Sequence, residues 1–266
     1  MEILNSVMNI RRFNRAQVSW MLYDWANSVF ATTVMAGFFP VFFKEYWSSG
    51  IEPTRSTAYL GFANSAASAL IAVLLPLLGV YSDICRAKKR LIFLFTCLGC
   101  FETFLLGTFE KGAFASAAVA YALGAFAFNG ACALYDALLA HIAAEEESDS
   151  LSSAGYALGY LGGGILFLLN VLMYQHPQWF SLESGVQAVR YSFYSAAVWW
   201  FVFSLPLFLF VEEKITPREE AGIWKAFRKT IEELVRTCRQ SHANQNLWFF
   251  LIAYWLYIDG VYSVIS

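Results

Sequence analysis

The run Trp20-Met-Leu-Tyr-Asp-Trp-Ala-Asn-Ser-Val-Phe-Ala-Thr-Thr33 places one carboxylate inside a long apolar segment. Residues 18–43 around it hold no other charged side chain, and the next charge is Lys44. A membrane-spanning helix needs about 20 mostly apolar residues, so this segment predicts a helix embedded in lipid. A carboxylate at the centre of such a helix costs about 2.5–3.5 kcal/mol to insert, which makes Asp24 a candidate functional residue. Asn27 follows at i+3, on the same helix face.

The whole chain has the composition of an integral membrane protein. Of its 266 residues, 58% are hydrophobic and only 14% are charged, whereas a soluble domain carries about 25% charged residues. Seven segments are long and apolar enough to span a membrane, at residues 18–43, 57–81, 90–109, 113–141, 153–175, 189–211 and 246–266. No segment alternates with period two in the manner of an outer-membrane barrel. The predicted fold class is an all-α membrane protein.

The positions of the basic residues predict the orientation of these helices. Fourteen of the 18 Lys and Arg residues lie before the first segment, between the second segment and the first residue of the third, or between the sixth and seventh. The other four are Lys44, Arg55, Lys111 and Arg190. Cytoplasmic loops carry the excess of basic residues, so the N-terminus is predicted to be cytoplasmic, at the inner membrane if the source is bacterial. The acidic connector after the fourth segment (Glu145, Glu146, Glu147 and Asp149) counts little in this rule. No basic stripe of the kind that binds nucleic acid is present.

Residues 212–245 differ from the spans around them. Thr216-Pro-Arg-Glu219 has the pattern of a helix start, and the apolar residues that follow recur at helical spacing opposite a charged face. This predicts an amphipathic linker helix that lies on the cytoplasmic membrane surface or on the bundle itself. The expected domains are a cytoplasmic segment at 1–17, a six-helix bundle at 18–211, the linker at 212–245 and a seventh helix at 246–266. Six spans, a linker and a new span are typical of half a two-repeat transporter entering its second half. A chain that ends at Ser266 is therefore expected to be cut short.

The loop Gly79-Val-Tyr-Ser-Asp83-Ile-Cys-Arg86-Ala-Lys88-Lys89-Arg90 connects the second and third predicted helices. It resembles the signature loop of the major facilitator superfamily, Gly-x-x-x-Asp-Arg-x-Gly-Arg-Arg. A glycine there permits close helix approach, and the aspartate can meet helix N-terminal dipoles or basic residues across the bundle. Ile84 stands where the superfamily has arginine, and Arg86 where it has glycine. The alternative interpretation is an ordinary positively charged cytoplasmic loop.

Four further segments resemble one branch of that superfamily, related to the vacuolar amino-acid effluxers of fungal autophagy. They are residues 23–33, 135–143, 155–170 and 254–261, with Ala140 at a position where proline is expected. The resemblance covers nearly the whole chain and implies a six-helix N-terminal bundle followed by the first helix of a second half. The same resemblance implies that the first, fourth and seventh helices line a central cavity together. It also implies a transporter of small solutes, with amino acids as the solute class.

The predicted substrate or ion pathway consists of the polar residues inside the spans. They are Asp24, Asn27, Asn129, Asp136, Asn170 and Asp259. At about 1.5 Å rise per residue, Asp24 and Asp136 lie about 9 Å and about 8 Å from the cytoplasmic ends of their helices, at matching depth. Two carboxylates that face one low-dielectric cavity cannot both ionise cheaply, so this pair is a candidate proton-coupling or ammonium-binding site. The alternative is that each carboxylate caps a neighbouring helix or binds backbone amides.

Gly155, Gly159 and Gly163 recur every four residues in the fifth segment, which predicts close helix packing. The Cys97-Leu-Gly-Cys100 spacing suggests a redox or metal motif, but it lies in an apolar helix without a second pair. We therefore expect helix packing there, with no metal ion and no cofactor.

The function predicted is secondary-active transport of a small solute, with the lipid bilayer, the solute and protons as partners. The alternative is a non-transporting membrane remnant or subunit, or a dimer if the short chain is stable. An intramembrane enzyme is disfavoured, because Asp136 and His141 have no nucleophile or metal partner at a matching depth.

Overall fold

A computed structural model describes residues 13–85, 87–213, 228, 231–232, 235–236 and 245–265. Every regular element among them is a helix. In chain order they are α2 (Arg15–Val29), η2 (Phe30–Phe38), α3 (Phe39–Phe42), η3 (Phe43–Trp47), α4 (Pro53–Cys85), α5 (Lys88–Leu106), α6 (Phe114–Ile142), α7 (Glu145–Gln175), η4 (Pro177–Phe180), α8 (Gly185–Phe210) and α10 (Gln245–Ile265). The predicted all-helical class is confirmed.

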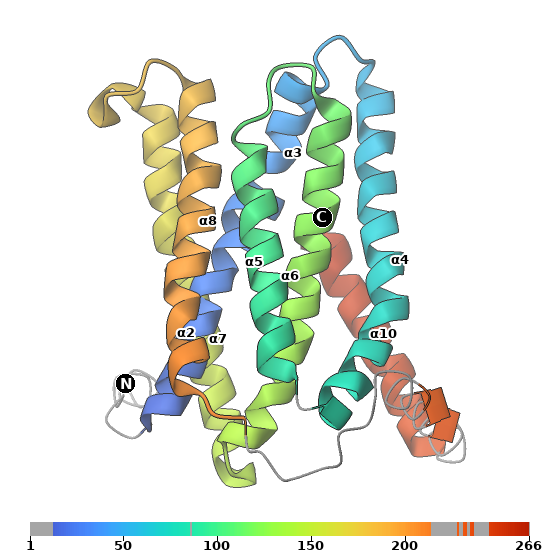
Figure 1. The fold of residues 1–266 in the computed structure, drawn as a ribbon. Helices are drawn as coiled ribbons and strands as arrows, with labels where there is room; N and C mark the ends of the chain where they lie inside the picture. Colours follow the sequence, from blue (N-terminus) through green and yellow to red (C-terminus); the bar gives the residue numbers. More distant parts are fainter. Residues whose placement is uncertain are drawn as a thin grey trace. The chain divides into compact units, whose positions relative to one another are not determined.

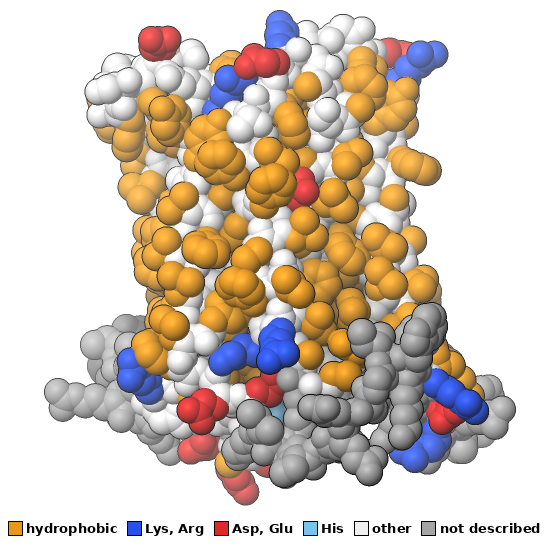
Figure 2. All heavy atoms as spheres, in the orientation of Figure 1, with side chains coloured by type: hydrophobic (Ala, Val, Ile, Leu, Met, Phe, Trp, Pro, Cys, Tyr) orange, Lys and Arg blue, Asp and Glu red, His pale blue; other side chains and the backbone are white. Residues whose placement is uncertain are grey.

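Five helical stretches of the described residues are long and apolar enough to cross a membrane. They cover Arg15–Trp47, Thr54–Ser82, Phe114–Ile142, Glu145–Gln175 and Gly185–Phe210. The third and seventh predicted spans are also helical, as α5 and α10, and Leu247–Tyr257 of α10 is apolar. Figure 2 shows hydrophobic side chains over the middle of the visible face, with most charged side chains near the helix ends. The chain is a helical membrane protein, and the six-helix bundle stays a prediction.

The chain divides into two compact units. The first comprises residues 1–72 and 88–214, and the second comprises residues 73–87 and 215–266. Within the first unit, α2 packs against α7 and α8, while α5 packs against α6 and α8 (Figure 1). The second unit holds the last turns of α4 and all of α10. Most of the predicted amphipathic linker lies outside the described residues.

The first membrane helix is longer and more irregular than its apolar pattern indicates. Asn14 and Gln17 form a reciprocal capping box that starts α2 at Arg15. From Phe30 the helix widens into nine residues of π-helix, returns to α-helix at Phe39, and widens again through η3. π-Helical turns inside α-helices are rare and often mark functional segments. Here they lie directly after the stretch that carries Asp24 and Asn27.

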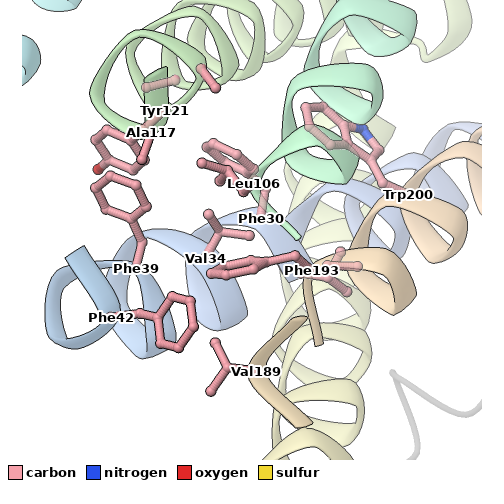
Figure 3. Close-up of a cluster of buried hydrophobic side chains, with 14 of the residues drawn as sticks. Phe30, Val34, Phe39, Phe42, Leu106, Ala117, Tyr121, Val189, Phe193 and Trp200 are labelled. Carbon is pink, nitrogen blue, oxygen red and sulfur yellow. The ribbon is translucent and has the colours of Figure 1, made fainter. Parts of the chain in front are cut away.

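An aromatic core joins this first helix to α5, α6 and α8 (Figure 3). Phe39 stacks on Tyr121 of α6 with ring centroids 3.8 Å apart, and Phe30 lies 5.5 Å from the indole of Trp200 of α8. Trp47 stacks on Phe193 at 5.8 Å. Such pairs contribute about 0.5–1.5 kcal/mol each beyond their area burial. The core therefore fixes how the first helix lies against the rest of the unit.

The acidic run after the fourth span is helical, not a connector. Glu145, Glu146 and Glu147 form the first turn of α7, and only Ala143 and Ala144 separate it from α6. The positive end of the helix dipole stabilises carboxylates in a first turn. Gln17 Nε2 also donates to Glu147 Oε2 at 3.0 Å, which ties the start of α2 to that of α7.

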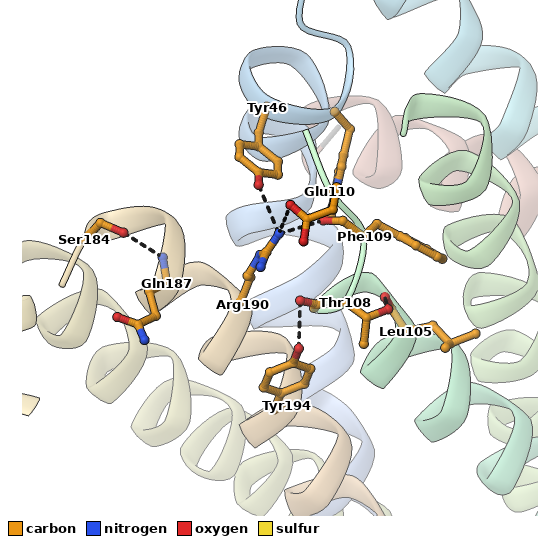
Figure 4. A network of polar contacts seen from close by, with 11 residues as sticks. Tyr46, Leu105, Thr108, Phe109, Glu110, Ser184, Gln187, Arg190 and Tyr194 are labelled. Carbon is orange, nitrogen blue, oxygen red and sulfur yellow. Dashed lines mark hydrogen bonds and ion pairs between the residues drawn. The ribbon is translucent and has the colours of Figure 1, made fainter. Parts of the chain in front are cut away.

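A polar cluster joins three segments at the other end of the first helix (Figure 4). Arg190 Nη2 of α8 pairs with Glu110 Oε2 at 3.0 Å and donates to Tyr46 Oη at 3.0 Å and Phe109 O at 3.2 Å. Tyr194 Oη donates to Gly107 O at 2.8 Å. Arg190 thus connects α8 to the end of the first helix and to the α5–α6 loop.

Candidate functional site

Asp24 lies on the face of α2 that packs against the glycines of α7. A Cβ placed on Gly155 would lie 2.9 Å from Asp24 Oδ2, and one placed on Gly159 would lie 2.7 Å from Ser28 Oγ. A Cβ placed on Gly163 would lie 3.0 Å from Thr32 Oγ1. Three side-chain oxygens at i, i+4 and i+8 of the first helix therefore face glycines at the same spacing on α7. A larger residue at any of these positions would have to displace the facing side chain of the first helix.

The glycine contact extends to Gly162, which the sequence pattern did not single out. A Cβ on Gly162 would lie 2.7 Å from both Trp25 O and Trp25 Cδ2. Trp199 Nε1 of α8 donates to the same Trp25 carbonyl at 3.2 Å, and the two indoles stack at 5.6 Å. Trp25 is thus held between α7 and α8, one residue beyond Asp24.

The stacked rings of Trp20 and Tyr135 also lie beside Asp24. Their centroids are 4.3 Å apart and their planes are within 11°. Trp20 Nε1 donates to Tyr135 O at 3.2 Å, and Tyr135 Oη donates to Trp20 O at 3.1 Å. The Asp24 carboxyl group and the same Tyr135 hydroxyl both face Gly155, at 2.9 Å (Oδ2) and 3.5 Å (Oη) from a Cβ placed there. Tyr135 lies 115 positions from Trp20 in the chain, and no sequence pattern predicted this contact.

Asp136, the second predicted carboxylate, directly follows Tyr135 on α6. Its side chain is exposed, while that of Asp24 is half-buried. Asn27 is buried and donates from Nδ2 to Cys132 Sγ at 3.3 Å, across the α2–α6 contact. These three predicted residues therefore gather around one level of the α2–α6 interface. Their roles in a pathway stay predictions.

The remaining predicted pathway residues lie elsewhere. Asn129 is exposed on α6 and donates to Ala125 O of its own helix at 2.7 Å. Asn170 of α7 is buried, and its Oδ1 accepts from Ser195 Oγ of α8 at 3.1 Å while its Nδ2 has no partner. Asp259 belongs to α10, and its side chain lies outside the described residues. The structure does not bring Asn129 or Asn170 to the Asp24 level by any described contact.

The predicted signature loop falls on both units of the chain. Gly79 and Asp83 lie in the last turns of α4, where Ser82 Oγ donates to Gly79 O at 2.7 Å. Arg86 and the Asp83 side chain lie outside the described residues. Lys88, Lys89 and Arg90 form the first turn of α5 rather than a loop.

Glu213 caps that first turn, a contact that sequence reasoning missed. Its Oε1 accepts from Lys88 N at 3.1 Å and its Oε2 from Lys89 N at 3.4 Å. Lys89 Nζ also donates to Val211 O at 2.7 Å. A carboxylate at a helix N-terminus satisfies unpaired amides and the helix dipole together. The end of α8 is thereby joined to the start of α5.

No three His, Cys, Asp or Glu side chains of the described residues gather closely enough to hold a metal ion. Cys97 and Cys100 lie on α5 as free thiols. Cys100 belongs to the buried aromatic core.

The sequence matches the profile of one protein family over most of its length. The profile described as "Vacuole effluxer Atg22 like" matches residues 13–266. The chain belongs to the Atg22-like family.

Two relatives support this membership. The Atg22-like chain is 32% identical, over 259 residues, to the "Uncharacterized MFS-type transporter YxiO" of Bacillus subtilis (strain 168). That match covers 97% of the chain and 60% of the relative. A second match, to "Autophagy-related protein 22-1" of Aspergillus niger, is 28% identical over 124 residues, covering 44% of the chain and 19% of that relative. The chain thus spans about three fifths of the length of the bacterial relative. No solved structure matches significantly.

Proposed function

We propose that this Atg22-like chain contributes the N-terminal half and first following helix of a secondary-active transporter that works by alternating access. The observation that carries the proposal is the half-buried Asp24 carboxyl group, which lies in a membrane helix between Gly155 and the Trp20–Tyr135 pair. A carboxylate at such a position is costly, and in membrane proteins it usually marks a substrate, ion or proton pathway. The transporter description of the bacterial relative supports the same function.

The proposed coupling ion is the proton. Asp24 and Asp136 interact across the α2–α6 contact, and no Lys or Arg is described as an ion-pair partner of either one. In a low-dielectric surrounding, two interacting carboxylates titrate as a unit and hold a proton between them readily. Binding and release of that proton would then accompany the change of access.

The proposed solute is a small polar molecule, with amino acids as the class that the family resemblance implies. The proposed orientation has the N-terminus in the cytoplasm, because fourteen of the 18 basic residues lie on that side. In this orientation, Asp24 and Asp136 lie near the cytoplasmic rim.

The test is uptake of labelled amino acids into proteoliposomes under an imposed proton gradient. The Asp24→Asn variant should lose gradient-driven uptake while still inserting into the membrane. Asp149→Asn, which changes an exposed carboxylate in the first turns of α7, is the matched control and should transport normally. Undiminished uptake by Asp24→Asn at every pH would exclude the coupling role. Absence of uptake by the unaltered chain for every amino acid would favour the non-transporting membrane subunit.

A further inference from the structure

The Tyr135 hydroxyl has one proton to donate, and both a backbone carbonyl and the Asp24 carboxyl group lie on its side of Gly155. It donates to the backbone carbonyl of Trp20 at 3.1 Å. The Asp24 carboxyl group is its other polar neighbour, and a Cβ on Gly155 would lie 2.9 Å from Asp24 Oδ2 and 3.5 Å from Tyr135 Oη. A phenol can donate one hydrogen bond and accept others. Which acceptor receives the proton therefore depends on the charge of Asp24.

We propose that Tyr135 is the positioning residue for the Asp24 carboxyl group and that its hydroxyl changes hydrogen-bond partner when Asp24 gains or loses a proton. With Asp24 ionised, the hydroxyl donates to the carboxylate, because hydrogen bonds to charged acceptors are about twice as strong as neutral ones. With Asp24 protonated, the carboxyl O–H donates to Tyr135 Oη, and the hydroxyl returns to Trp20 O. In both protonation states, the Tyr135 hydroxyl and any proton on the Asp24 carboxyl group each have one acceptor.

The change costs little at Trp20. Its carbonyl belongs to α2, where it also accepts the amide of residue 24 in the helical pattern, so it stays paired in both states. The Trp20 Nε1 bond to Tyr135 O at 3.2 Å and the ring stacking at 4.3 Å do not involve the hydroxyl. The two helices thus remain attached while one bond between them is made or broken. This inference rests on the proposed proton coupling and names the residue that would carry it from α2 to α6.

Three other groups face Asp24 and bear on its protonation. Asp136 and Tyr135 come from α6, as does Cys132, whose thiol accepts from Asn27 and interacts with both carboxyl groups. On the α7 side, the facing positions are glycines. Asp136 is therefore the one neighbouring carboxylate described, and its charge opposes that of Asp24.

The experiment is infrared difference spectroscopy of the purified chain in lipid, comparing acidic with neutral buffer, with tyrosine rings isotopically labelled. The inference predicts a protonated-carboxyl band and a tyrosine C–O band that change together. Asp24→Asn should remove both changes, and Tyr135→Phe should remove the tyrosine change while the carboxyl band remains at a displaced frequency. Tyr194→Phe is the matched control, since its hydroxyl also donates to a carbonyl of a neighbouring segment, Gly107, with no carboxyl group as a described hydrogen-bond partner.

A tyrosine change that persists in Tyr135→Phe, or one that survives Asp24→Asn, would overturn the inference. If Asp24→Asn does not fold, Gly155→Ala replaces it: the added methyl displaces the carboxylate from Tyr135, and both bands should shift, whereas Gly164→Ala, with no atom within 4 Å, should leave them unchanged. Spectra that shift under Gly164→Ala as strongly as under Gly155→Ala would also count against it. The spectra can be recorded whether or not the chain transports a solute. A failed uptake experiment would therefore count against the proposed function without counting against the positioning role of Tyr135.

Discussion

Trp20 and Tyr135 each donate a hydrogen bond to the other's backbone carbonyl, at 3.2 Å and 3.1 Å, while their rings stack at 4.3 Å. This reciprocal contact is the closest described link between α2 and α6 beside Asp24. Both side chains are buried. This aromatic pair therefore fixes the position of α2 against α6 one turn before Asp24.

Replacing Trp20 should test the strength of that link. Trp20→Phe removes the Nε1 donor and weakens the stacking, and an interhelical hydrogen bond in a membrane contributes about 1–2 kcal/mol in model peptides. The thermal unfolding midpoint of the purified chain in detergent should fall. Trp179→Phe, at an exposed position of η4, is the control and should leave the midpoint unchanged. Equal loss in the two variants would show that the reciprocal contact carries no special stability.

The α7 glycines provide a graded steric test. Gly163→Ala adds a methyl 2.9 Å from Thr32 Cγ2, and Gly159→Ala adds one 2.7 Å from Ser28 Oγ. Overpacking of this kind costs about 1–3 kcal/mol, which should appear as a lower unfolding midpoint in detergent. Gly164→Ala meets no atom within 4 Å, and the helix preference of alanine over glycine should make it neutral or stabilising. A Gly164→Ala variant as unstable as the other two would contradict the described α2–α7 contact.

Periodicity and composition were enough to predict the helical membrane class and the approximate helix centres. They could not predict the nine-residue π-helix at Phe30, because widening of the turns changes the hydrogen-bond register without changing which residues are apolar. They also misassigned Glu145–Glu147 to a connector. An acidic run between apolar segments fits a loop and a helix first turn equally well, and the neighbouring Gln17 that binds Glu147 is 130 positions away in the chain.

For the candidate site, the costly charge of Asp24 and the glycine spacing could be read from the sequence. The partners could not, since Tyr135, Gly162 and Glu213 are ordinary residues until long-range packing brings them to their contacts. For Asn129, no sequence pattern indicated its bond to the carbonyl of Ala125 one turn earlier, and its place in a pathway stays a prediction.

Arg190 should contribute far more stability than the carboxylate that pairs with it. Glu110 is 79% exposed, and exposed ion pairs contribute about 0–1 kcal/mol, so Glu110→Gln should barely change the unfolding midpoint. Arg190→Ala also removes the bonds to Tyr46 Oη and Phe109 O and should lower it clearly. Unfolding in detergent with and without added salt checks the assignment. Salt should remove most of the small effect of Glu110→Gln, whereas most of the effect of Arg190→Ala should persist, since screening acts on the exposed pair.

Glu213 should control fraying at the start of α5. Glu213→Ala leaves the amides of Lys88 and Lys89 without their carboxylate partner, and loss of a helix N-terminal cap costs about 0.5–2 kcal/mol. Hydrogen–deuterium exchange at these two amides should accelerate, while exchange in the middle of α5 stays slow. Glu212→Ala, which changes the exposed neighbour, is the matched control and should leave both amides protected. Exchange at Lys88 and Lys89 that is fast in the unaltered chain, or that is the same in all three proteins, would show that Glu213 does not hold the end of α8 against the start of α5.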